Sequence, residues 1–206
     1  MAEGSQVQDI YITLMRESLV STVKAQGVDS SLIEKAFQKA KEAHGDQKRD
    51  EGTAYIAHPV RVAGILAWEV GIPDSEVLAA ALLHDTLEDT EITYEDLRRD
   101  FGPRVAEIVK LVTKQEETSP EEEAEIDRAY LQGIREAKDP GVALVKLSDR
   151  LDNVRCMRFN PRAEKRAKYI RKTEALYLPL AREKHEYLAR AIREGIEQLK
   201  SVERGN

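Results

Sequence analysis

The chain has 206 residues, of which 41% are hydrophobic and 34% charged, and its formal net charge is −6. These values describe a globular chain that is long enough to bury one sizeable core. The longest apolar run, from Val77 to Leu83, is too short to cross a bilayer, which excludes a membrane-spanning protein. The single cysteine, Cys156, excludes an internal disulfide and a metal site built from thiolates.

The N-terminus contains no basic segment followed by an apolar one, so we expect a cytoplasmic protein without a membrane partner. Glycine and proline are scattered, aromatic residues make up 5% of the chain, and strand-like alternation is scarce. This pattern predicts an all-α protein with a single domain over residues 1–206.

The first part of the chain is predicted to hold three helices. Gly27 would end the first helix, and Asp29 or Ser30 would cap the second. We therefore expect helices over about 11–26, 30–44 and 60–70, with a polar loop over 46–54 that leads to His58 and Pro59. Proline suits the first turn of a helix because it has no backbone N–H.

The stretch from Ser75 to Thr90 is predicted to be a central helix, capped by Asp74 or Ser75. Apolar residues 77–83 lead directly into four polar ones: His84, Asp85, Glu88 and Asp89. At about 3.6 residues per turn, His84 would lie above Glu88 and Asp85 above Asp89. Crowded carboxylates that are buried without a cation are costly in free energy, so this arrangement predicts a bound metal ion.

Further helices are expected after this stretch. Thr93 and Asp96 form a predicted capping box, and Gly102 and Pro103 separate that helix from one over 105–113. The acidic residues 115–127 are predicted to form a solvated loop with an exposed first turn. The remaining helices are expected over 130–137, over 142–153 and, as a pair, from about residue 163 onward.

Three separate segments offer metal ligands: His58, the His84-Asp85 step, and Asp149 on an apolar helix. Two imidazoles and two carboxylates suit Mn²⁺, Fe²⁺, Co²⁺ or Mg²⁺ better than a structural zinc ion, which prefers thiolates. Two plainer interpretations stay open: His58 as a core histidine, and Asp149 as a buried ion-pair partner beside Arg150.

Four motifs occur in order along the chain: AHGDQKR at 43–49, YIAHP at 55–59, HDTLEDT at 84–90 and VKLSDRLDN at 145–153. Together they resemble the HD-domain metal-dependent phosphohydrolases and, more closely, the hydrolase domain of the RelA/SpoT (alarmone) family, including its small single-domain hydrolases. The resemblance covers about residues 30–181. It implies a helical bundle of the HD type, a stand-alone hydrolase, and one Mn²⁺ ion held by His58, His84, Asp85 and Asp149.

The resemblance also implies roles for residues near these ligands. Glu88 and Asp89 would orient a water and accept its proton, although both could instead brace the turn. Arg49 would stack on the nucleotide base. Further substrate contacts are expected from Lys48, Lys114, Lys146 and Asn153, and His44 is interpreted as structural.

One basic stretch favours a small polyanionic substrate. Residues 146–172 contain ten basic residues (Lys146, Arg150, Arg155, Arg158, Arg162, Lys165, Arg166, Lys168, Arg171 and Lys172) and three acidic ones (Asp149, Asp152 and Glu164). The overall acidity of the chain argues against nucleic-acid binding. About half of these basic residues are expected to be helix surface away from any ligand.

We therefore expect hydrolysis of the 3′-pyrophosphate of guanosine tetraphosphate or pentaphosphate. Asp50 and Asp152 depart from the family pattern, which often has a basic residue and a histidine at these positions. They leave open an HD phosphohydrolase of another nucleotide, such as a deoxynucleoside monophosphate or NADPH. A domain that binds alarmone without turnover is the other alternative, and the intact Glu88-Asp89 pair argues against it.

Overall fold

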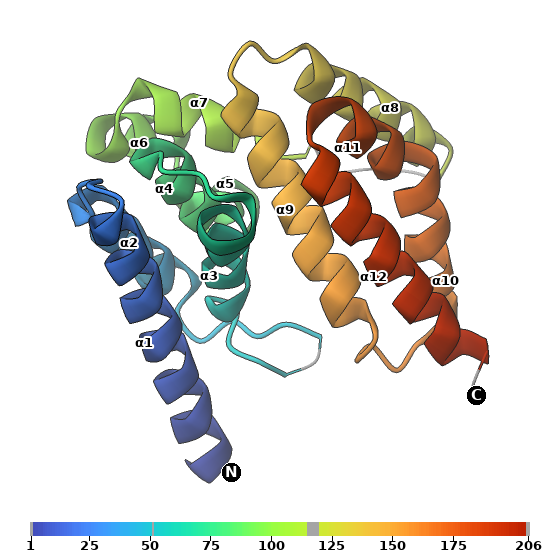
Figure 1. Ribbon diagram of the computed structural model, residues 1–206, viewed down its shortest axis with the longest axis horizontal. Helices are drawn as coiled ribbons and strands as arrows, with labels where there is room; N and C mark the ends of the chain where they lie inside the picture. Colours follow the sequence, from blue (N-terminus) through green and yellow to red (C-terminus); the bar gives the residue numbers. More distant parts are fainter. Residues whose placement is uncertain (1, 51, 115–119, 205–206) are drawn as a thin grey trace. The chain divides into compact units, whose positions relative to one another are not determined.

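The computed structural model describes residues 2–50, 52–114 and 120–204, and the regular secondary structure in these ranges is helical (Figure 1). No strand occurs in these ranges, although one isolated antiparallel bridge joins Lys48 to Ala54. The all-α prediction is therefore confirmed. None of the described helices has the length and apolar composition that crossing a membrane requires.

Packing contacts divide the chain into two compact units, Met1–Thr113 and Lys114–Asn206. The first unit contains α1 (Ala2–Ala25), α2 (Ser31–His44), α3 (Ala57–Gly64), the π-helix η1 (Ile65–Val70), α4 (Ser75–Leu83), α5 (Thr86–Asp89), α6 (Tyr94–Phe101) and α7 (Pro103–Val112). The second unit contains α8 (Pro120–Glu136), α9 (Pro140–Met157), α10 (Ala163–Lys172), the π-helix η2 (Thr173–Tyr177), α11 (Leu178–Lys184) and α12 (Glu186–Arg204). The single domain over 1–206 stays a prediction.

Helix α4 is largely buried in the first unit. It packs against α2, α3 and α7, and every residue from Val77 to Leu83 is buried. A helix that is apolar on all sides is stable only inside a core. Asp74 caps α4 as predicted, because its carboxylate accepts the backbone N–H groups of Glu76 and Val77. His84, which directly follows α4, is therefore held at the end of a buried and capped helix.

The prediction of one continuous helix from Ser75 to Thr90 is wrong, because α4 ends at Leu83. His84 and Asp85 lie in a turn, and α5 then adds one short helical segment. The Thr86 hydroxyl donates to the Leu83 carbonyl at 2.7 Å, so a side chain supplies a partner for a carbonyl at the helix end. The backbone N–H of Asp89 still donates to the Asp85 carbonyl at 2.9 Å, so a helical hydrogen bond joins these two residues after the break.

The helix boundaries of the first unit otherwise follow local signals. Helix α1 begins at Ala2, earlier than predicted, and it ends just before Gly27, whose φ of 75° favours glycine. Its N-terminal half extends beyond the other helices of this unit (Figure 1). The capping box of Thr93 and Asp96 is present at the start of α6, as predicted.

The second unit is built around α9, which runs beside α12 (Figure 1). Gly195 of α12 permits the close approach: a Cβ added there would come within 2.8 Å of Val154 Cγ1 on α9. Both Leu188 and Ile192 of α12 are fully buried. This packing fixes α9, the helix that carries Asp149, inside its own unit.

The prediction of a solvated acidic loop over 115–127 is wrong for its second half, because residues from Pro120 onward belong to α8. Asp127 is only 3% exposed, and its carboxylate lies 2.7 Å from Lys114 Nζ and 2.6 Å from Lys172 Nζ. Glu123 pairs with Lys168 at 2.7 Å. The sequence pattern failed here because the basic partners are distant in the chain. Residues 115–119 lie outside the described residues.

Candidate metal centre

Two buried histidines of the first unit lie side by side. His58, in the first turn of α3, is 1% exposed, and His84, after α4, is 2% exposed. Their ring centroids are 5.1 Å apart, and their ligating nitrogens lie within 4.8 Å of each other. The Nδ1 of His84 lies 2.9 Å from the Ala81 carbonyl oxygen. Because a carbonyl only accepts, Nδ1 carries a proton, which leaves Nε2 as the nitrogen that could bind a metal.

The carboxylate of Asp85 faces both histidines. Its Oδ1 lies 3.1 Å from His84 Nε2, and its Oδ2 lies 3.6 Å from His58 Nε2. Two imidazole nitrogens and a carboxylate form a donor set that suits a divalent cation. The structure thus brings three of the predicted ligands together, and their role as ligands stays a prediction.

Tyr55, to which sequence reasoning assigned no role, connects this group to the predicted water-directing carboxylates. Its hydroxyl lies 2.8 Å from Asp85 Oδ2 and 2.5 Å from Asp89 Oδ2. Burial, together with the charges of these two carboxylates, raises the pKa of the Tyr55 hydroxyl, so it stays a protonated donor. The available signal was its place in the YIAHP motif, three residues before His58. Glu88 and Asp89 are both exposed at the end of α5.

A second layer of contacts supports Tyr55 and Asp89. The imidazole of His44 stacks on the Tyr55 ring, with centroids 4.4 Å apart. The Gln47 side chain links His44 to Asp89. Its Oε1 lies 2.8 Å from His44 Nδ1, and its Nε2 donates to the Asp89 carbonyl at 2.8 Å. His44 is thereby buried in a hydrogen-bonded cluster, which agrees with its interpretation as a structural residue.

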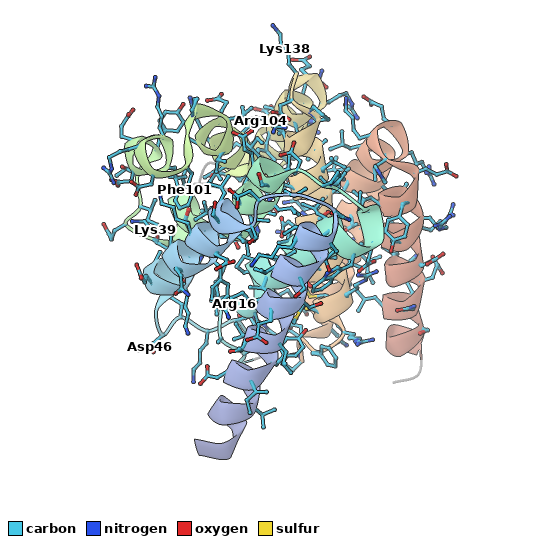
Figure 2. The ribbon with its side chains drawn as sticks, turned by 60° about the vertical axis from the view of Figure 1, so that its left-hand side comes forward. Arg16, Lys39, Asp46, Phe101, Arg104 and Lys138 are labelled. Carbon is cyan, nitrogen blue, oxygen red and sulfur yellow. The ribbon has the colours of Figure 1, made fainter. Side chains whose placement is uncertain are left out.

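The two predicted substrate contacts of the 46–54 segment face different surroundings. Arg49 is half-buried, and its Cζ lies 5.7 Å from the centre of the Tyr55 ring. Lys48 is exposed and lines a cavity of about 590 Å³, whose wall also includes Arg16 of α1 and Asp46. Figure 2 labels these two residues, Arg16 on α1 and Asp46 just after α2. Asp50, a departure from the family pattern, is exposed. Arg49 therefore lies near Tyr55, whereas Lys48 lies at the cavity.

In the second unit, α9 presents Lys146, Asp149 and Asn153 to one another. Asp149 is 6% exposed; Lys146 Nζ lies 2.9 Å from its Oδ2, and Asn153 Nδ2 donates to its Oδ1. Burial alone would lower the pKa of Lys146, but the neighbouring Asp149 carboxylate raises it well above its ordinary value. Asp149 therefore has an ion-pair partner in Lys146, one turn before it on α9.

The basic stretch 146–172 is largely engaged within the second unit. Arg150 lies over Tyr177, with its Cζ 3.5 Å from the ring centre, and Arg166 donates to the Asn160 carbonyl at 2.6 Å. Lys168 and Lys172 pair with the carboxylates of α8. Lys114, a predicted phosphate contact, is likewise paired with the buried Asp127. Arg150 and Arg166 are each 7% exposed, so these two are buried residues and not the helix surface that the sequence suggested.

The buried histidines and the His84-Asp85 step, presented by short helices, are typical of HD-domain proteins. A family model described as "HD domain" matches residues 36–185. The guanosine-3′,5′-bis(diphosphate) 3′-pyrophosphohydrolase of Aquifex aeolicus is 49% identical over 150 residues, which is 72% of this chain and 21% of that protein. The bifunctional (p)ppGpp synthase/hydrolase SpoT of Escherichia coli K12 is 40% identical over 151 residues, 72% of this chain and 21% of SpoT. The chain thus spans about a fifth of the length of these curated relatives.

A solved structure extends the comparison to a shorter protein. It is described as a metazoan ortholog of SpoT that hydrolyzes ppGpp, and it superimposes with a TM-score of 0.73 at 30% identity, covering 82% of this chain and 96% of that one. The chain belongs to the HD domain family, in the branch of the RelA/SpoT hydrolase domains.

Proposed function

We propose that the chain is a metal-dependent hydrolase that removes pyrophosphate from the 3′ position of guanosine tetraphosphate or pentaphosphate. The observation that carries the proposal is the grouping of His58, His84 and Asp85 beside Asp89, with Tyr55 between the carboxylates. The named activities of the Aquifex and E. coli relatives, and of the metazoan ortholog of SpoT, supply the substrate class. Membrane and nucleic-acid partners have no part in this proposal.

We further propose that His58, His84, Asp85 and Asp149 hold one divalent cation, with Mn²⁺ as the physiological ion and Mg²⁺, Co²⁺ or Fe²⁺ as substitutes. Nitrogen and carboxylate donors support this choice over a thiolate-selective metal. Asp149 belongs to the second unit, and its proposed role rests on its place in the VKLSDRLDN motif at 145–153. When bound, such a cation polarises a phosphoryl oxygen and lowers the pKa of a water molecule.

The side chains of α5 would direct the chemistry. Asp89 and Glu88 orient the water for in-line attack on the phosphorus joined to the 3′ oxygen, and they accept one of its protons. A bond forms between the water oxygen and this phosphorus, and the bond from phosphorus to the 3′ oxygen breaks. The 3′ oxygen gains a proton and leaves as the hydroxyl of GDP or GTP, while the two phosphoryl groups leave as pyrophosphate.

Substrate binding is proposed to involve Arg49, Lys48, Lys114, Lys146 and Asn153. The guanidinium plane of Arg49 suits stacking on a purine, and the lysines offset the charge of the diphosphates. Lys114 and Lys146 have carboxylate partners in Asp127 and Asp149, so substrate phosphates would have to compete for them.

The proposal is tested by removing metal from the purified chain with a chelator and restoring it with Mn²⁺. Guanosine tetraphosphate is then compared with deoxynucleoside monophosphates and NADPH, with pyrophosphate and orthophosphate measured separately. We expect no turnover after chelation, recovery with Mn²⁺, and pyrophosphate from guanosine tetraphosphate alone. Orthophosphate from the other nucleotides would favour a different HD phosphohydrolase, and binding of guanosine tetraphosphate without turnover would favour a sensor.

A further inference from the structure

The Tyr55 hydroxyl faces two carboxylates with a single proton to donate. Asp85 Oδ2 lies 2.8 Å away and Asp89 Oδ2 lies 2.5 Å away. A phenol offers one O–H donor, so the two ionised carboxylates compete for it. The carboxylate that accepts the hydrogen bond gains a charge-assisted hydrogen bond, which is stronger than one between neutral groups.

The position of this hydroxyl is fixed by contacts on the other side of the ring. His44 stacks on the Tyr55 ring with an interplanar angle of 15°. The Tyr55 backbone N–H donates to the Gln47 carbonyl at 3.0 Å, and the Gln47 side chain is tied to both His44 and the Asp89 backbone. The hydroxyl is therefore held in place within hydrogen-bond distance of both carboxylates.

The Asp89 side chain needs a hydrogen-bond partner to hold it in one conformation, because its position at the end of a short helix does not do so. It is exposed at the last position of α5, a four-residue helix, and Thr90 after it is extended. An exposed carboxylate at a helix end samples several rotamers unless a hydrogen bond selects one. The Tyr55 hydroxyl supplies that hydrogen bond.

A cation at the proposed site would determine which of the two carboxylates accepts the Tyr55 hydrogen bond. Asp85 would share its lone pairs with the metal and become a weaker acceptor, so the Tyr55 hydroxyl would donate to Asp89. We propose that Tyr55 is a positioning residue that hands its hydrogen bond from Asp85 to Asp89 when the metal binds, and so fixes the carboxylate that directs the water. This inference rests on the proposed function, since it assumes that Asp89 acts on the attacking water.

The test is Tyr55→Phe, which removes the hydroxyl and keeps the ring that stacks on His44. Tyr94→Phe is the matched control, because the Tyr94 hydroxyl donates to the exposed Glu107 at 3.3 Å, in the same unit but away from these ligands. Losing one charge-assisted hydrogen bond should lower kcat for Tyr55→Phe by roughly tenfold to a hundredfold. The KM and the Mn²⁺ dissociation constant, measured by titration calorimetry, should stay within about twofold of wild type. Tyr94→Phe should match wild type in all three.

Combining Tyr55→Phe with Asp89→Asn separates positioning from a structural role. With Asp89 already unable to accept a proton, loss of the hydroxyl should have little further effect on kcat. The inference is overturned if Tyr55→Phe retains wild-type kcat, if it weakens Mn²⁺ binding in step with activity, if the two changes multiply, or if the variant fails to fold. Failure of the proposed function would look different, because wild type itself would then release no pyrophosphate.

Discussion

Replacing Asp89 by asparagine is expected to lower kcat for guanosine tetraphosphate by about a hundredfold to ten-thousandfold, because a positioned general base typically contributes that much. Asparagine keeps the shape of the side chain and can still accept the Tyr55 hydrogen bond at its oxygen, but it cannot take a proton from water. Asp89 is not among the proposed ligands, so the Mn²⁺ content of the variant should equal that of wild type. Single-turnover kinetics and metal analysis on the same preparation measure both quantities.

Glu91→Gln is the matched control for this prediction. Glu91 is exposed two residues after Asp89, and its replacement makes the same chemical change outside the proposed site. It should leave kcat at the wild-type value. An Asp89→Asn variant as active as this control would show that Asp89 only braces the turn after α5.

Replacing Asp149 by asparagine is expected to weaken Mn²⁺ binding by more than about a hundredfold, since even residues that merely support ligands contribute tenfold to a hundredfold. Hydrolysis should fall in parallel at limiting metal concentration. In the metal-free protein, Lys146 would lose its buried partner, and unpaired buried charges cost about 3–5 kcal/mol. Titration calorimetry and urea unfolding of the metal-free chain test the two consequences separately.

This pair of measurements decides between the two interpretations of Asp149. If the residue served only as the ion-pair partner of Lys146, the variant would be less stable but would bind Mn²⁺ like wild type. Asp152→Asn is the matched control, because Asp152 is also a buried aspartate of α9, with Cys156 Sγ 3.9 Å from its Oδ2, and it is not a proposed ligand. Its metal affinity should be unchanged.

The sequence predicted the features that depend on local chemistry. Asp74 and Thr93 cap their helices because a short polar side chain followed by an apolar run signals a helix start. The apolar residues from Val77 to Leu83 mark a buried helix, so His84 was correctly placed at the end of one. These signals lie within a few residues of the structure that they determine.

The features that sequence reasoning missed depend on contacts between distant residues. The turn after Leu83 uses the Thr86 hydroxyl as a partner for a backbone carbonyl, and no periodicity in the sequence reveals that choice. Asp127 was predicted to be solvated because its partners, Lys114 and Lys172, are 13 and 45 residues away. Tyr55 was overlooked because its significance lies in two carboxylates 30 and 34 residues further along.

The most direct test of the central proposal is Mn²⁺-supported hydrolysis of guanosine tetraphosphate in ¹⁸O-labelled water, with the products identified by mass spectrometry. Attack of water on the phosphorus joined to the 3′ oxygen predicts one ¹⁸O atom in the released pyrophosphate and none in GDP. Orthophosphate as the product, or label in the nucleotide, would contradict the proposed reaction.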